Sequence, residues 1–94
     1  MSIITITNQS FEEAGGSRGF PNLSLAGIVY GQVVIGKGKV ETMKRADIFL
    51  EAEANMRSIT HVFKVEHQLD LEGHPSNDNY SCFSYGSGYR VKSK

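Results

Sequence analysis

The residues best suited to hold a metal ion gather in the last third of the chain: His61, Glu66, His67, Glu72, His74 and Cys82. Zinc sites use such ligands, but they usually take them from close-spaced pairs of cysteine or histidine, and the sequence has no such pair. His61 and His67 share one side of a predicted strand, yet six residues of extended chain separate them by roughly 20 Å. The sequence therefore predicts no metal and no cofactor. It favours half-buried, hydrogen-bonded histidines, with a pH-sensitive contact as the alternative.

Nucleophilic chemistry would have to use Cys82, the only cysteine. Its alternating context, Tyr-Ser-Cys-Phe-Ser-Tyr, is typical of a strand in which the thiol is a small apolar side chain. The glutamates are explained by helix capping and a solvated helix surface rather than by paired acid–base work. The sequence thus predicts no catalytic residue and a protein that is not an enzyme.

Two glycine-rich stretches could cradle an anion with their backbone amides, and each carries basic side chains. They are Gly15–Gly19, which contains Arg18, and Gly36–Lys39, which contains Lys37. Neither ends in the Gly-Lys-Ser/Thr pattern of a phosphate-binding loop, so plain turns are favoured for both.

The C-terminal run from Phe83 onward interleaves aromatic and basic residues, a pattern that suits stacking on bases and neutralising phosphates. A structural interpretation is favoured over this one. It joins two strands, Tyr80–Tyr85 and Tyr89–Lys94, by a turn at Gly86–Gly88, and it uses the cations to protect an edge strand from pairing with another chain. The candidate partner-binding residues from all of these stretches and from the predicted helix are Arg18, Lys37, Lys39, Lys44, Arg45, Tyr85, Tyr89, Arg90 and Lys92.

The element that should position these groups is a long strand over Ile59–Leu71, because the sequence alternates there for thirteen residues. One parity should face the core as the floor beneath the helix: Ile59, His61, Phe63, Val65, His67, Leu69 and Leu71. Ile3–Thr7 predicts a first strand, and Leu23–Ile35 predicts one curved strand or two strands joined near Gly31. Ser10 and Glu13 have the spacing of a capping box.

Met43–Arg57 is the one convincing helix, and Thr42 is its predicted N-cap. A broad stripe should cover the sheet, made of Met43, Ala46, Ile48, Phe49, Leu50, Ala52, Glu53 and Met56. Lys44 and Arg45 lie at the positive end of the helix dipole, where cations are disfavoured, which hints that they serve a surface or a partner.

The whole chain of 94 residues is the size of one domain, predicted to span residues 1–94. We expect an α+β fold with one main helix on a mostly antiparallel sheet of about five strands. Ten basic and ten acidic residues balance, which argues against a dedicated polyanion binder. A single cysteine and the absence of a signal-like or membrane-spanning stretch predict a cytoplasmic protein.

Three functional hypotheses follow. The first is a small non-enzymatic protein-binding domain that occludes a macromolecular partner as a regulator or inhibitor, for example a virus- or mobile-element-encoded inhibitor of a host defence enzyme. Surface aromatics and strand edges support it, and it could act as a homodimer. The second is a nucleic-acid-binding module that uses the basic residues at the helix start and in the C-terminal run. The third is a thiol-dependent enzyme built on Cys82.

Overall fold

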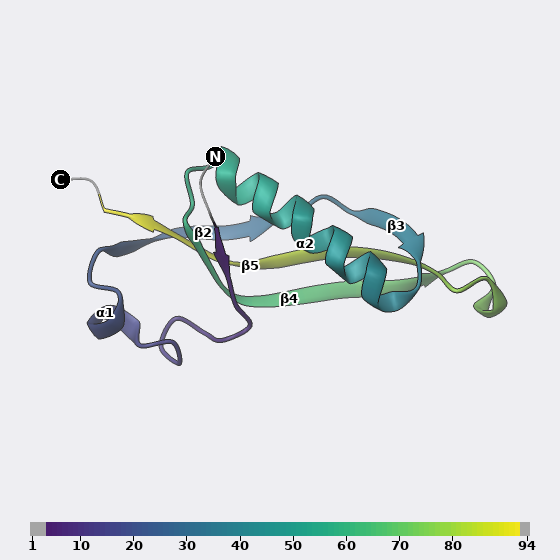
Figure 1. The fold of residues 1–94 in the computed structure, drawn as a ribbon, viewed down its shortest axis with the longest axis horizontal. Coiled ribbons are helices and arrows are strands. Elements are labelled where there is room, and N and C mark those ends of the chain that lie inside the picture. The colour runs from purple at the N-terminus through teal and green to yellow at the C-terminus, as the bar shows by residue number, and fades with distance from the viewer. Residues whose placement is uncertain (1–3, 93–94) are drawn as a thin grey trace.

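The computed structural model describes residues 4–92 and has the predicted α+β fold, with one main helix on a five-stranded sheet (Figure 1). Along the chain the elements are β1 (Thr5–Ile6), α1 (Gly16–Gly19), β2 (Leu23–Tyr30), β3 (Val34–Lys37), α2 (Lys39–Met56), β4 (His61–Glu72), the 3₁₀ turn η1 (Pro75–Asn77) and β5 (Asn79–Val91). The sheet order is β1-β4-β5-β2, and β3 also pairs with β5. All pairs are antiparallel except β1 with β4.

The central strand is β5, which pairs with β4 on one side and with β2 and β3 on the other. The predicted turn at Gly86–Gly88 is therefore wrong, and so is the prediction that the C-terminal strand protects an edge. These glycines make room for packing instead: a Cβ atom on Gly86 would lie 2.7 Å from Val62 Cγ1, and one on Gly88 would lie 2.5 Å from Val29 Cγ2. A side chain at either position would clash with its neighbours, so close packing requires glycine here just as some turns do.

The predicted parity of Ile59–Leu71 is wrong in its first half, because a β-bulge interrupts β4 between Phe63 and Glu66. Lys64 adopts a left-handed conformation with φ of 53°. Its amide donates to the Gln9 carbonyl at 2.7 Å, and the Val65 amide donates to the Thr7 carbonyl at 3.1 Å. A bulge adds one residue and so reverses the alternation. Before it Val62 faces α2, whereas after it Val65 and the later odd-numbered residues do.

Helix α2 begins four residues earlier than predicted, and its N-cap is Gly38 rather than Thr42. The Thr42 hydroxyl donates back to the Gly38 carbonyl at 2.6 Å. The buried stripe is narrower than expected and consists of Thr42, Ala46, Leu50 and Ala54. Ile48 and Met56 are 63% and 81% exposed, so their predicted contact with the sheet is wrong. Helix α2 rests mainly on the central strand β5, and it also contacts β3, β2 and β4.

The other predicted elements are confirmed with shifted limits. Leu23–Ile35 forms two strands, β2 and β3, separated by residues 31–33. The Ser10–Glu13 capping box is present: the Glu13 amide donates to Ser10 Oγ at 3.1 Å and the Ser10 amide to Glu13 Oε1 at 2.9 Å. The loop after it contains the single turn α1. The first strand is shorter than Ile3–Thr7, and Ile3 lies outside the described residues.

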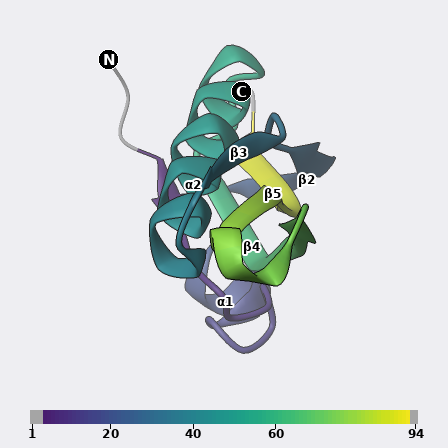
Figure 2. The same cartoon turned by 90° about the vertical axis from the view of Figure 1, so that its right-hand side faces the viewer.

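The chain between β1 and β2, residues 7–22, which we call the N-terminal segment, covers one half of the sheet face that α2 leaves free. Helices α1 and α2 therefore lie on opposite sides of the sheet (Figure 2). The contacts of the N-terminal segment are aromatic and join Phe11 and Phe20 to His61, Phe63 and Tyr89. The rings of Phe11 and Tyr89 stack at 4.4 Å. This covered half contains His61 and Phe63, which explains why these residues are half-buried and buried although they face away from α2.

Candidate interaction surface

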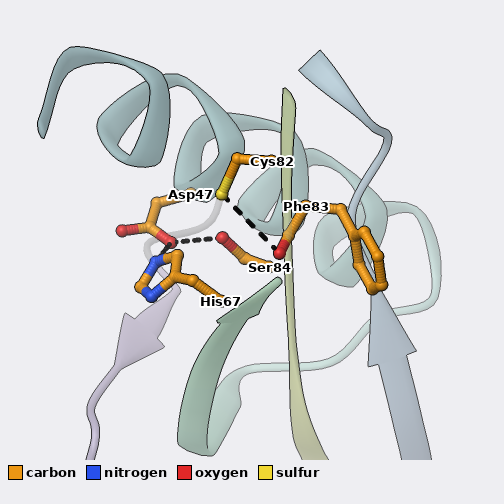
Figure 3. A network of polar contacts seen from close by, with 5 residues as sticks. All are labelled: Asp47, His67, Cys82, Phe83 and Ser84. Atoms are coloured by element: carbon orange, nitrogen blue, oxygen red, sulfur yellow. Dashed lines mark hydrogen bonds and ion pairs between the residues drawn. The ribbon is translucent and has the colours of Figure 1, made fainter. Parts of the chain in front are cut away.

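A cluster of polar side chains of catalytic type lies between α2 and the sheet (Figure 3). Asp47 Oδ1 accepts from Ser84 Oγ at 2.7 Å and lies 2.8 Å from His67 Nε2. These residue types form the Ser-His-Asp triad of hydrolases, in which histidine takes the proton from serine. Here the carboxylate stands between the other two side chains, and Ser84 has no solvent-exposed surface. The network therefore ties α2 to β4 and β5 and presents no nucleophile to a substrate.

Cys82 lies beside this network and is almost completely buried. Burial raises the pKa of the Cys82 thiol, and the carboxylates of Asp47 and Asp70 raise it further. A catalytic cysteine needs the opposite environment, because the thiolate is the nucleophile. Its thiol lies 3.8 Å from the Phe83 carbonyl, a weak contact that fits a packing role.

The sheet face opposite α2 is uncovered beyond the bulge, and it carries an apolar surface that we call the open-face patch. Its members are Ile28, Tyr30, Ile35, Phe83 and Tyr85. The exposed fractions of Ile28, Tyr30 and Ile35 are 55%, 57% and 65%. The Tyr30 ring lies 5.9 Å from Tyr85 and 6.3 Å from Phe83. A continuous group of exposed aromatic and branched side chains is typical of a binding surface rather than of free surface.

An acidic row on β4 borders the open-face patch. Glu66 stands opposite Tyr85, Gln68 opposite Phe83 and Asp70 opposite Ser81. The Tyr85 hydroxyl donates to Glu66 Oε2 at 2.9 Å, and this bond and the carboxylate charge raise the pKa of Tyr85. A shallow depression at this border is lined by Ile28, Lys64, Glu66 and Tyr85, together with Gly86 and Ser87. The surface thus combines apolar area with fixed negative charge.

The structure does not bring the predicted partner-binding residues together. Lys37 pairs with Asn79 at one end of β5 and Arg90 lies near the other end, roughly 35 Å away at the rise of an extended strand. Lys39 and Lys44 lie near the first end, on the first turns of α2, whereas Arg18 on α1 and Lys92 after β5 lie near the second (Figure 1). The cations form two separate groups rather than one basic patch.

Three more predicted residues have specific places. Tyr85 belongs to the open-face patch, whereas Tyr89 lies in the covered half, where burial raises the pKa of its hydroxyl. Arg45 donates to the Ile35 carbonyl on the edge strand β3 at 3.1 Å. The sequence did not identify Ile28 and Ile35 as surface residues, because branched apolar residues in a strand are typical of the core. The available signal was the alternation of Ile28 and Tyr30 around the buried Val29.

Within residues 4–92 no group of three or more potential ligands could hold a metal ion. The same residues contain no helix long and apolar enough to cross a membrane. Comparison of the chain with protein-family models, with curated proteins and with solved structures gives no match.

Proposed function

We propose that this chain is a non-enzymatic protein-binding domain that acts through the open-face patch and regulates or inhibits its partner by occlusion. The observation that carries the proposal is the exposure of Ile28, Tyr30 and Ile35 beside two partly buried aromatic rings on an uncovered sheet face. Burial of such side chains against a partner contributes about 25 cal/mol for each Å² removed from water. The nature of the partner, including the example of a defence enzyme, stays a prediction.

The polar network supports binding rather than catalysis as the mode of action. Ser84 and Cys82 are the candidate nucleophiles of this network, and both are buried. Ser84 donates to the Asp47 carboxylate rather than to a histidine, and the Cys82 thiol lies against a main-chain carbonyl. A domain of this kind can still act on a larger protein by covering a surface that the larger protein needs.

The test compares the proteins that three forms of the chain retain from a nuclease-treated cell lysate. Wild type is compared with a patch variant, Tyr30→Thr with Ile35→Thr, and with a control on α2, Ile48→Gln, which changes a side chain that is 63% exposed. We expect a protein, at fixed stoichiometry, that wild type and the control retain and the patch variant loses.

Equal retention by all three forms would contradict the proposal, provided that circular dichroism shows the patch variant to be folded. Binding that is seen only in a parallel lysate without nuclease, and that falls steeply with salt, would instead support the nucleic-acid hypothesis.

A further inference from the structure

The outer edge of β4 is free over its second half. Pairing with β1 ends at Val62, and the N-terminal segment accepts the amides of Lys64 and Val65. From Glu66 to Glu72 the part of the chain that the structure describes places no strand on this side of β4 (Figure 1). A strand edge of this length can pair with an added strand.

The direction of the free main-chain groups follows from the last bond before the gap. The Val65 amide points outward to Thr7. Main-chain groups along a strand point alternately to the two sides, so those of His67, Leu69 and Leu71 also point outward. Glu66, Gln68 and Asp70 then face β5, which agrees with the Ser84 carbonyl pointing the other way, to the Gly31 amide. Three amides and three carbonyls therefore line the free edge.

The opposite edge of the sheet, formed by β2 and β3, has side chains bound to its main-chain carbonyl groups. Arg57 Nη1 donates to the Ile28 carbonyl at 2.9 Å, and Arg45 Nη1 donates to the Ile35 carbonyl at 3.1 Å. Side chains of α2 and of its C-cap residue Arg57 thus occupy carbonyl groups of β2 and β3 that an added strand would need. The side-chain hydrogen bonds to main-chain carbonyls within residues 4–92 do not reach the outward groups of β4.

The side chains along the free edge indicate which kind of strand could pair with it. Glu66, Asp70 and Glu72 are exposed on the open face, and no ion pair engages them within residues 4–92. On the other face Leu69 is half-buried and Leu71 is 44% exposed. A neighbouring strand would place its residues beside an acidic row on one face and beside leucines on the other.

We infer that the β4 edge accepts an extended segment of a partner protein in which basic and apolar residues alternate. The inference rests on the proposed function, and it specifies the partner's chemistry. The added strand would pair with His67, Leu69 and Leu71 through its main chain, set its basic side chains against Glu66, Asp70 and Glu72, and extend the leucine surface with its apolar ones. The partner's body would then lie beside the open-face patch, which shares the face of the acidic row.

A second copy of this chain is a poor occupant of the same edge. In a two-fold antiparallel pairing of β4 with itself, the acidic row would stand opposite its own copy: centred on Leu69, for example, Glu66 would oppose Glu72. Like charges directly opposite each other destabilise a strand pair. The charge of the row therefore selects a different partner.

The test uses blocked nine-residue peptides and nuclear magnetic resonance of the whole chain in about 0.15 M salt, where screening length is about 8 Å. One peptide alternates lysine and valine, a second replaces lysine with glutamate, and a third groups the lysines without changing composition. We expect the first to bind at least about tenfold more tightly than the other two. On its binding the amides of His67, Leu69 and Leu71 should become protected from hydrogen exchange.

A charge-reversed edge, Asp70→Lys with Glu72→Lys, should prefer the glutamate peptide, whereas Glu51→Lys on the exposed surface of α2 should keep the original preference. Absence of protection at the three amides, or an unchanged preference in the reversed edge, would overturn the inference. The lysate comparison separates the two proposals. A protein that is lost by the patch variant and retained by the reversed edge would leave the proposed function standing and refute strand addition. Peptide pairing at β4, together with a lysate protein that the patch variant retains as well as wild type does, would support strand addition and contradict the proposed function.

Discussion

Lys64 has a left-handed backbone conformation, with φ of 53°, which residues with a side chain disfavour. A non-glycine residue in the left-handed region costs about 1–2 kcal/mol, and glycine avoids most of that cost while losing more chain entropy on folding. Lys64→Gly should therefore raise the free energy of unfolding by about 0.5–1 kcal/mol, whereas Lys64→Ala should leave it nearly unchanged. Urea denaturation monitored by circular dichroism measures both.

Gln68 supplies the matched control, because it is exposed on the same strand and is not among the residues with positive φ. Gln68→Gly should lower the free energy of unfolding by about 0.5–1 kcal/mol. A loss of stability of the same size in Lys64→Gly would show that the bulge does not hold Lys64 in a left-handed conformation.

His61 should make the stability depend on pH. Burial lowers the pKa of this histidine below its ordinary value of 6.5, because the charged ring is poorly solvated between Phe20 and Phe63. Between the lowered pKa and about 6.5 the unfolded chain binds more protons at this site than the folded chain does. The contribution of His61 is therefore fully present above about pH 6.5 and is lost as the pH falls towards the lowered pKa.

The variant His61→Phe keeps an aromatic ring in the cluster and removes the titration. Its free energy of unfolding should fall less than that of wild type between pH 7.5 and pH 5, as measured by urea denaturation at each pH. Parallel pH profiles for the two proteins would contradict this origin of the acid sensitivity.

At the scale of elements, the edge formed by β2 and β3 depends on Arg45 of α2 and on Arg57, the C-cap of that helix. Arg45 and Arg57 donate to main-chain carbonyls that a second sheet could otherwise use. The double variant Arg45→Met with Arg57→Met should therefore self-associate more strongly than wild type as concentration rises, and light scattering after size-exclusion chromatography measures its mass. Lys44→Met is the control, since Lys44 makes only an exposed pair with Glu41 at 3.6 Å. A double variant with the same mass as wild type at every concentration would mean that this edge is protected in another way.

The elements themselves were largely predictable, and their faces were not. Composition and periodicity located α2, the strands β1 to β4 and the Ser10–Glu13 box because each depends on neighbouring residues. The bulge at Lys64 was invisible, because its cause is the N-terminal segment crossing β4 from more than fifty residues away. The glycines of β5 were misread for a similar reason: contact with Val62 and Val29, far away in sequence, decides their identity.

The candidate surface follows the same division. Tyr85 was among the candidate residues, since aromatic residues interleaved with small polar ones are conspicuous in a sequence. The branched residues of the open-face patch could not be separated from core residues, because both belong to strands and only the register of β5 decides which face is covered. The free edge of β4 depends on sheet order, which local sequence does not specify.

At the scale of the whole molecule, α2 and β5 should make unfolding one cooperative event. Val29, Leu50 and Val62 belong to one buried cluster, and Val34, Ala46 and Cys82 belong to another. Both clusters lie between α2 and the sheet, and β5 runs beneath them and on into the aromatic cluster of the covered half. Disruption of one cluster should therefore lower the stability of the others.

Cys82 reports on this cooperativity because it is buried in the second cluster. A folded chain should react with an aromatic disulfide reagent only through opening. When closing is faster than labelling, the free energy of opening obtained from the rate should equal the free energy of unfolding from circular dichroism. In the variant Ser17→Cys an exposed thiol should react in a separate fast phase, which fixes the intrinsic rate. An opening free energy that lies well below the global value would show that the end containing β3 opens by itself, and the helix would then not transmit stability between the two clusters.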